Sequence, residues 1–305
     1  MRDILVIGSL NMDMVIKTPH IPAPGETITG TFSAYLPGGK GANQACAAGK
    51  LGGSAAMLGM VGRDAFGESL LNSLRTAGVD TSLIGRCDEH TGQAIIYVGS
   101  TGNNSIVVLP GANQACDAAF VAAYEEEIAA SRCVMLQMEI PFEAVCTALE
   151  LAAKHGCKVV LNPAPAVGPL PASILKTVDF LTPNETELSL LTGLPVENDE
   201  QAVSAARSLI AEGVRCVLAT LGSKGALLVT AQESRLFPAC RVQPVDTTAA
   251  GDTFNAAFAV RMAEGASMEE AITFANAAAA ISVTRPGAQP SIPSRAETDA
   301  MLQGE

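Results

Sequence analysis

Short apolar segments alternate along this chain with longer segments whose apolar residues recur at helical spacing. The apolar run Val134–Met138 is followed by Phe142–His155, where apolar side chains recur every three or four positions, and then by a second run at Lys158–Leu161. Gly156 is a stop signal between the predicted helix and the next strand. Such alternation favours a mostly parallel sheet covered by helices on both faces, which is an α/β fold.

The same pattern extends over most of the sequence. Further strands are predicted at Ile4–Ile7, Ala55–Met60, Val178–Thr182, Cys216–Thr220 and Ala226–Val229. Further helices are predicted at Asn43–Leu51, Asp64–Ala77, Asp117–Ser131, Glu200–Glu212, Gly251–Glu264 and Met268–Val283. No internal repeat, low-complexity tract or linker interrupts these elements, so residues 1–305 are predicted to form a single domain.

Two stretches depart from this rhythm. Residues 13–35 contain Pro19, Pro22 and Pro24 among β-prone residues, and residues 93–109 alternate in a strand-like way on both sides of a glycine- and asparagine-containing turn. Neither stretch fits a strand–helix unit. Both are predicted to form antiparallel strands, which would make a small lid inserted at one edge of the main sheet.

The formal net charge of −12 argues against a nucleic-acid partner, because phosphate backbones are bound by surplus lysine and arginine. An anionic ligand would need a local site of backbone amides, a metal ion and a few cations. The eight cysteines include no C-x-x-C pair, which favours free thiols in a reducing compartment. No signal peptide and no bilayer-length apolar run is visible. We therefore expect a soluble cytoplasmic protein without a membrane partner.

The segment Val245–Asn255, VDTTAAGDTFN, carries the clearest chemical signal. Its small residues lead into a predicted helix, and the amides and dipole at a helix N-terminus attract anions. Asp252 would lie beside a phosphate bound there. A carboxylate next to an anion site suits phosphoryl transfer, which needs a base and charge stabilisation. Asp252 could instead simply cap the helix, as aspartate often does.

The segment Gly38–Ala45, GGKGANQA, is rich in glycine but is not a P-loop, because Gly41 occupies the position where that motif needs serine or threonine. Its glycines would allow a ligand to approach closely, with Lys40 and Asn43 offering polar groups to hydroxyls. A plain glycine-rich turn before a helix is the alternative interpretation.

Three further segments could either contact a ligand or be purely structural. Asn184 and Glu187 follow a predicted strand, where ligands bind in open α/β sheets, and a carboxylate there could hold Mg²⁺ through water. The same pair could equally cap a helix. Residues 220–225 could form a nucleotide-contacting turn or an ordinary hairpin, and residues 285–291 a cation-facing or a plain loop.

The order and spacing of these segments resemble the ribokinase family, also called the PfkB-type carbohydrate kinases, from about Asp3 to Arg295. Gly38–Ala45 looks like the first signature of that family, and Asp246–Asn255 looks like its second, more specific one. The strings GGKGANQA and RPGAQPS resemble the ribokinase branch in particular. The resemblance implies a three-layer sandwich and ATP-dependent phosphorylation of D-ribose at O5, with deoxyribose or another small sugar as the alternative substrate.

The resemblance also implies roles for individual residues. Asp252 would be the catalytic base, and Ala249, Ala250 and Gly251 would form the anion hole. The sugar would be bound by Asn11, Asp13, Gly39, Lys40, Gly41, Ala42, Asn43, Glu139 and Asp252. ATP and Mg²⁺ would be bound by Asn184, Glu187, Thr220, Gly222, Ser223, Lys224, Gly225, Gly251 and Asn276. An activating K⁺ would be bound, mostly through carbonyl groups, by Asp246, Thr248, Ser282, Arg285, Gly287 and Ser291.

Partners and competing functions follow from the same resemblance. The lid strands of the family pair between subunits, which implies a homodimer. A nucleoside kinase would need an aromatic or apolar base pocket, and aromatic residues make up only 4% of this chain. A sugar-binding regulator that had lost catalysis on this scaffold would lack Asp252 or the small residues before it, and both are present.

Overall fold

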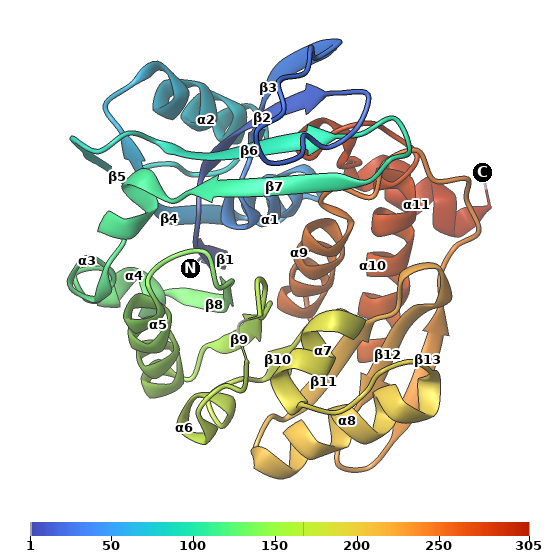
Figure 1. The fold of residues 1–305 in the computed structure, drawn as a ribbon. Coiled ribbons are helices and arrows are strands. Elements are labelled where there is room, and N and C mark those ends of the chain that lie inside the picture. Colours follow the sequence, from blue (N-terminus) through green and yellow to red (C-terminus); the bar gives the residue numbers. More distant parts are fainter. Residues whose placement is uncertain (1, 167, 305) are drawn as a thin grey trace.

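Nine strands form one large sheet in the computed structural model, which describes residues 2–166 and 168–304 (Figure 1). The order across the sheet is β13 (Ser234–Pro238), β12 (Gly225–Val229), β11 (Cys216–Thr220), β10 (Phe180–Leu181), β9 (Lys158–Leu161), β8 (Ser131–Leu136), β1 (Arg2–Ile7), β4 (Ala55–Gly62) and β5 (Ile84–Cys87). All neighbours from β11 to β5 pair in parallel, and β12 and β13 add an antiparallel edge.

Strand β1 shows why this sheet is covered on both faces. Its residues Ile4–Ile7 are fully buried, and successive side chains of a strand point to opposite faces. Ile4 and Val6 accordingly join one apolar cluster, and Leu5 and Ile7 join the other. A continuous apolar run of this kind is the expected signature of a strand buried on both sides.

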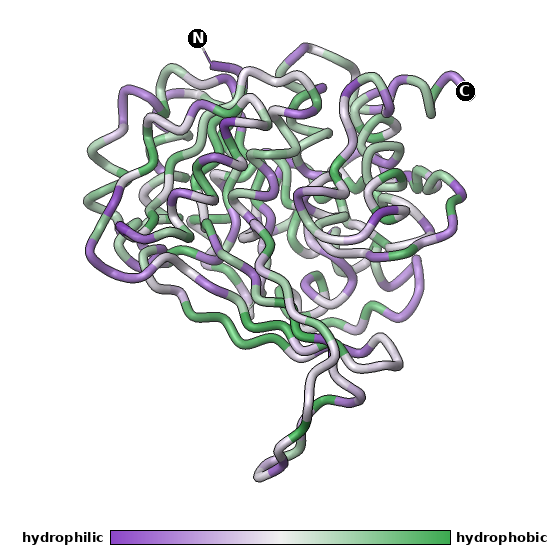
Figure 2. The backbone as a smooth tube through the Cα atoms, turned by 90° about the horizontal axis from the view of Figure 1, so that it is seen from above, coloured by the Kyte–Doolittle hydropathy of each residue, from purple (hydrophilic) through white to green (hydrophobic). Residues whose placement is uncertain are grey.

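Helices form the two outer layers. The cluster on one face is completed by α1 (Lys40–Lys50), α2 (Ala65–Thr76), α9 (Ala250–Ala263) and α10 (Met268–Ser282), with α11 (Arg295–Gln303) beyond α10. The other face is covered by α3 (Ala118–Ala122), α4 (Glu125–Ala129), α5 (Phe142–His155), α6 (Ala172–Leu175), α7 (Glu185–Thr192) and α8 (Asp199–Glu212). This confirms the three-layer arrangement. Apolar stretches run through the interior and polar ones follow much of the periphery (Figure 2).

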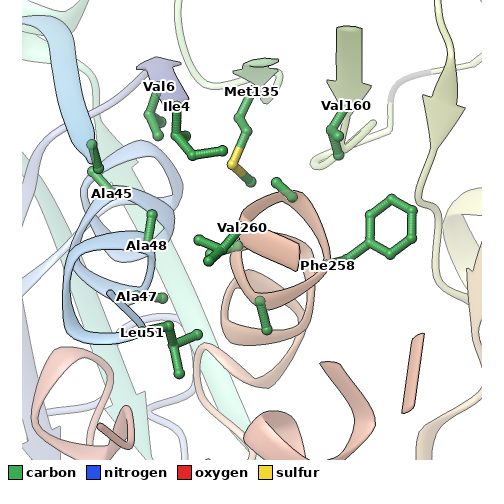
Figure 3. Packing of buried hydrophobic residues seen from close by; sticks show 14 of the residues in the cluster. Ile4, Val6, Ala45, Ala47, Ala48, Leu51, Met135, Val160, Phe258 and Val260 are labelled. Carbon is green, nitrogen blue, oxygen red and sulfur yellow. The ribbon is translucent and has the colours of Figure 1, made fainter. Parts of the chain in front are cut away.

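Packing of α9 beside α1 on one face of the sheet fixes the geometry on which the candidate site depends. Figure 3 shows Val260 of α9 close to the alanines of α1, including Ala48, and to Ile4 of β1. Phe258 lies on another side of the same helix, toward Val160 of β9. Small side chains on α1 let the two helices approach closely. Their N-terminal turns, which carry the glycine-rich segment Gly38–Ala45 and the small residues before Asp252, are therefore held side by side.

A second, smaller sheet has the order β3 (Phe32–Gly38), β2 (Asn11–Lys17), β6 (Gly92–Val98) and β7 (Asn104–Leu109). Strands β2 and β3 pair antiparallel, as do β6 and β7, in agreement with the expected hairpin patterns. Strands β2 and β6 pair with each other in parallel. The alternation of apolar and polar residues within each hairpin does not predict the pairing of β2 with β6, because these two strands are far apart in the sequence.

Several elements differ from the sequence prediction, and strand β5 and helices α6 and α11 were not anticipated. The helix expected over 117–131 is broken at Tyr124, whose φ of −110° and ψ of 28° leave the helical region while its ring packs edge-on against Phe120. A helix-forming composition is thus not sufficient to keep this segment continuous. The strand expected over 178–182 is reduced to β10, and strand β13 was not anticipated. In the two ranges that the structure describes, no helix is long and apolar enough to cross a membrane.

Candidate active site

A cavity of about 180 Å³ opens at the carboxyl ends of the parallel strands, beside the first turns of α1 and α9. Asn162 follows β9, Thr182 follows β10 and Thr220 ends β11, and all three line it. Ligands of open α/β sheets bind at this edge. The complete lining is Lys40, Asn162, Ala164, Thr182, Asn184, Glu187, Thr220, Thr247, Ala249, Ala250, Gly251, Asp252 and Asn255.

The first turn of α9 offers unused backbone donors to this cavity. Ala249 is the N-cap residue in the left-handed conformation, with φ 59° and ψ 15°, and it provides no side-chain cap. Of the predicted anion-hole residues, Ala250 already donates its amide to the Thr247 carbonyl at 3.2 Å. Within the described residues, the amides of Gly251 and Asp252 donate to no protein acceptor. A Cβ added at Gly251 would meet nothing within 4 Å, so the space beside it is open. The turn is therefore built to accept an anion.

Asp252 is not the cap of its helix, so that alternative interpretation was wrong. Its side chain is 6% exposed and lines the cavity. One carboxylate oxygen, Oδ2, accepts a hydrogen bond of 3.0 Å from Asn43 Nδ2, and the other, Oδ1, accepts one of 3.0 Å from Gln44 Nε2. The two signature segments, which lie 209 residues apart at their contact, thus meet at this carboxylate.

Asp13 of β2 lies on the glycine-loop side of the site. A Cβ at Gly38 would come within 2.0 Å of Asp13 Oδ2, so only glycine leaves room for this carboxyl group. Burial raises the pKa of Asp13 to about 7, and the negative charges of Glu139 and Asp252 add to the effect, whereas Lys40 opposes it. Several acidic groups therefore share a confined space with a single lysine beside them.

Glu139 ties the glycine loop to the strands. Its Oε2 accepts hydrogen bonds from Ser9 Oγ at 2.6 Å and from the Lys40 amide at 3.0 Å. Burial alone would lower the pKa of Lys40, but Asp252, Glu139 and other carboxylates reverse this and raise it. The lysine is therefore held in its charged form at the edge of the cavity.

On the opposite side, Asn184 and Glu187 both line the cavity and also form a reciprocal capping box on α7. Asn184 Oδ1 accepts from the Glu187 amide and Glu187 Oε2 accepts from the Asn184 amide, each at 2.8 Å. Burial raises the pKa of the Glu187 carboxyl group. The structural and the ligand-binding interpretations of this pair are thus compatible, because the cap leaves the carboxylate beside the cavity.

The remaining predicted nucleotide residues are more dispersed. Residues 220–225 connect the antiparallel strands β11 and β12, as the hairpin interpretation predicted, and only Thr220 of this turn lines the cavity. Gly222, Ser223 and Lys224 are exposed, and Lys224 pairs with Asp199 at 2.7 Å. Asn276 lies on α10, where its Nδ2 donates to two carbonyl groups of β13.

The predicted cation residues surround one loop. Asp246 Oδ1 accepts from the Thr248 amide at 2.9 Å, and its Oδ2 accepts from the Gly287 amide at 2.8 Å. The carbonyl groups of Arg285 and Gly287 accept no hydrogen bond from any described residue. Three members have other partners: the Arg285 guanidinium pairs with Glu297, and the Ser282 and Ser291 hydroxyls donate to nearby carbonyls.

Several residues at the site escaped the sequence analysis. Asn162 directly follows a predicted strand and Thr182 is the last residue of another, so the rule that ligands bind at strand carboxyl ends could have found them. Gln44 lies in the glycine-rich segment and Gln137 in an apolar run, but neither had such a signal, because a buried glutamine shows its partner only in three dimensions. Gln44 donates a hydrogen bond to Asp252, and Gln137 donates one to Gln44.

Comparisons with known proteins agree with this geometry. Residues 1–295 match the pfkB family of carbohydrate kinases. The chain is 44% identical to a ribokinase of Haemophilus influenzae over 303 residues, covering 99% of both chains. It is 39% identical to a deoxyribokinase of Salmonella typhi, covering 96% of both. The solved structure of Arabidopsis thaliana ribokinase complexed with ribose and ATP matches with a TM-score of 0.93 and 38% identity over 99% of both chains. The chain therefore belongs to the pfkB family of carbohydrate kinases.

Proposed function

We propose that this enzyme transfers the γ-phosphoryl group of ATP to O5 of D-ribose. The observation that carries the proposal is the position of Asp252, whose carboxylate lies between the free amides of α9 and the Asn43 side chain of the glycine-rich segment. The Haemophilus influenzae and Arabidopsis thaliana relatives are ribokinases, and the latter was solved with ribose and ATP. The similarity to these relatives supports ribose and ATP as the substrates of this chain.

In the proposed reaction, Asp252 accepts the proton of the O5 hydroxyl as that oxygen bonds to the γ-phosphorus. The bond from phosphorus to the bridging oxygen breaks, and ADP leaves. Little covalent chemistry falls to the protein, so positioning and charge stabilisation dominate. The amides of Gly251 and Asp252, together with Lys40, would stabilise the negative charge on the transferred group.

Substrate binding would divide between the two sides of Asp252. The sugar hydroxyls would be bound on the side of β2 and the glycine loop by Asn11, Asp13, Gly39, Lys40, Gly41, Ala42, Asn43 and Glu139. ATP would extend across the cavity toward Asn184, Glu187, Thr220, Gly222, Ser223, Lys224, Gly225 and Asn276. In this arrangement the small sheet of β3, β2, β6 and β7 would serve as the lid over the sugar.

Glu187 would hold Mg²⁺ in company with the ATP phosphates. Within the described residues, no group of three or more His, Cys, Asp or Glu side chains could bind a metal by itself. That composition suits Mg²⁺, which keeps several waters and is bound by one or two carboxylates and substrate phosphates. When bound, the ion would neutralise charge on the phosphates. Glu187 is suitably placed because it lines the cavity and remains half-buried.

K⁺ would bind at the loop of Asp246, Gly287 and their neighbours, where the carbonyl groups of Arg285 and Gly287 have no donor among the described residues. A cation there would steady the segment that leads into α9 and its anion-binding turn.

We expect turnover to be higher in KCl than in NaCl at equal ionic strength, and Asp246→Ala to reduce this difference, because the Asp246 carboxylate links both halves of the loop. Initial rates across a K⁺ titration measure the effect. Equal rates in the two salts would refute the cation site.

The sugar is tested by a coupled ADP-release assay with ATP, Mg²⁺ and K⁺. We expect turnover with D-ribose to exceed that with other sugars. Deoxyribose is the second candidate, favoured by 39% identity to the Salmonella typhi deoxyribokinase. The assay should therefore compare D-ribose, 2-deoxy-D-ribose and a nucleoside. Absence of turnover with ribose would reject the proposed substrate, and preference for deoxyribose would establish the alternative.

We also propose that the lid pairs with the lid of a second copy. Strand β7 is an edge strand, and its consecutive side chains Ile106–Leu109 are each 47–52% exposed, as are Phe32 and Tyr35 of β3 at 51% and 54%. Exposed apolar edges of this kind are usually covered by a partner.

A charge in this surface should separate the subunits. We expect the wild-type chain to sediment as a dimer and Val107→Lys to shift it toward the monomer, because an unpaired charge cannot be buried cheaply in an apolar interface. Sedimentation velocity over a concentration series measures the change. The exposed substitution Val245→Lys, which lies outside the lid, is a matched control. A monomeric wild type would contradict the proposal.

The cellular setting is proposed from the thiols. The cysteines Cys46, Cys87, Cys116, Cys133, Cys146, Cys157, Cys216 and Cys240 are all unpaired. Free thiols of this number are typical of a reducing compartment, which supports a cytoplasmic location. The net charge of −12 continues to argue against a nucleic-acid partner.

A further inference from the structure

We propose that Gln44 is a positioning residue for Asp252, and that Gln137 determines which end of the Gln44 amide faces that carboxylate. The inference rests on the proposed function, because it assumes that Asp252 is the base. It concerns two buried glutamines that have no direct access to the sugar or to the nucleotide.

Gln44 can influence the reaction only through its hydrogen bond to Asp252. Its side chain is fully buried in α1, and it is not among the residues that line the cavity. Gln44 Nε2 donates to Asp252 Oδ1 at 3.0 Å, while Asn43 Nδ2 donates to Oδ2 at 3.0 Å. One donor on each oxygen fixes the plane of the carboxylate. Asn43 is also predicted to contact the sugar, whereas Gln44 has no predicted contact with either substrate.

The direction of the Gln44 amide is set by its other contacts. Gln137 Nε2 donates to Gln44 Oε1 at 2.6 Å, and Gln44 Nε2 lies 3.4 Å from Asn162 Oδ1. The donor end of the amide therefore faces two oxygens, and its acceptor end faces a donor. A flipped amide would place an oxygen against the Asp252 carboxylate and a nitrogen against the nitrogen of Gln137.

The position of Gln137 is unfavourable for the stability of the fold in two respects. A Cβ at Gly8 would lie 2.1 Å from Gln137 Oε1, so the end of β1 must carry glycine to admit the amide. Gln137 Oε1 itself is buried and has no hydrogen-bond partner among the described residues. Leaving a buried acceptor unsatisfied is unfavourable. Its retention is consistent with a requirement for the Nε2 contact to Gln44.

Two consequences follow for catalysis. A carboxylate held in one plane presents a lone pair to the hydroxyl in every encounter, whereas a rotating one does so only part of the time. Hydrogen bonds donated to a carboxylate also favour its ionised form, which is the form that accepts a proton. Loss of the Gln44 donor should therefore lower kcat.

The test compares steady-state kinetics of Gln44→Met and Gln137→Met with those of the wild type. Methionine preserves the size of the side chain but removes its donors. We expect Gln44→Met to lower kcat by about 10- to 100-fold, with the sugar KM within about threefold of the wild-type value. Gln137→Met should have a smaller effect, and the double variant should be no worse than Gln44→Met alone.

Gln44→Glu adds a readout that a purely structural role would not produce. When protonated, this glutamic acid can donate to Asp252 as the amide does; when ionised, it repels the carboxylate. We therefore expect the activity of Gln44→Glu to fall as pH rises, opposite to the acid limb of the wild type. Gln232→Met, at an exposed turn far from the cavity lining, is the control for the substitution itself.

Far-ultraviolet circular dichroism and thermal melting establish that each variant is folded. The inference is overturned if folded Gln44→Met keeps the wild-type kcat, or if the pH dependence of kcat in folded Gln44→Glu is the same as in the wild type. Should Gln44→Met fail to fold, Gln137→Met and Gln44→Glu carry the same test. Failure of the proposed function is distinguishable, because the wild-type chain itself would then show no sugar-dependent ADP release.

Discussion

Asp252→Asn is expected to lower kcat by about 10²- to 10⁴-fold while sugar binding survives. The amide cannot accept the proton of the sugar hydroxyl, so the reaction loses its base. Sugar binding should persist because the hydroxyls would still meet Asp13, Asn43 and Glu139. Single-turnover ADP formation measures the loss, and isothermal titration calorimetry with D-ribose measures binding.

The design needs a control because asparagine also alters the local hydrogen bonds. Asn43 and Gln44 both donate to Asp252, and an asparagine offers only one acceptor oxygen to these two donors. Asp252→Ala removes both contacts and should lose at least as much turnover. Asp88→Asn, at a side chain that is 99% exposed, controls for the loss of one negative charge. Near-normal turnover in folded Asp252→Asn would reject Asp252 as the base.

The large sheet could be predicted from the sequence because its signals are local. Apolar runs, helical spacing and glycine stops recur with each strand and helix, and the helix Phe142–His155 and the strand Lys158–Leu161 are found with the predicted bounds. Tyr124 marks the limit of this reasoning. The acidic, alanine-rich sequence around it favours a continuous helix, whereas the backbone leaves the helical region at Tyr124.

The candidate site could be predicted in part, for a related reason. Glycine-rich segments and an aspartate at a helix start are visible in one dimension, and the structure brings Lys40, Asp252 and Glu187 to one cavity. Their relation to Gln137 and Asn162 depends on the order of strands β8 and β9 beside β1, which no local pattern contains. Hydrogen bonds between residues a hundred positions apart therefore remained invisible until the fold was known.

Asp13→Asn is the second substitution for which a large effect is expected. A carboxylate that accepts two sugar hydroxyls contributes about 1.5–3 kcal/mol for each hydrogen bond, which corresponds to a loss of about 10²- to 10⁴-fold in affinity. Calorimetric titration of the variant with D-ribose measures this loss. Asp117→Asn, at the exposed N-cap of α3, is a control that also removes one acidic group. Unchanged affinity in Asp13→Asn would place the sugar elsewhere.

The same substitution should stabilise the free protein at neutral pH and above. The pKa of Asp13 is about 7 against an ordinary value of 3.8, so between these values the folded chain holds a proton that the unfolded chain has released. The free energy of unfolding therefore falls as pH rises from about 4 to 7, by on the order of 4 kcal/mol. Asparagine removes this cost. The melting temperature of Asp13→Asn should exceed that of the wild type at pH 8 and match it at pH 4.

Sugar binding should also change the ionisation of Asp13. Hydroxyl groups that donate to Asp13 favour its ionised form, so the pKa of Asp13 must fall when the sugar binds. Near pH 7 binding should then release a proton, and below pH 7 the affinity for ribose should weaken because Asp13 has first to be deprotonated. Calorimetry in two buffers with different ionisation enthalpies counts the released protons. A wild-type affinity that is the same at pH 6 and pH 8, with no proton released, would show that ionised Asp13 does not face the sugar.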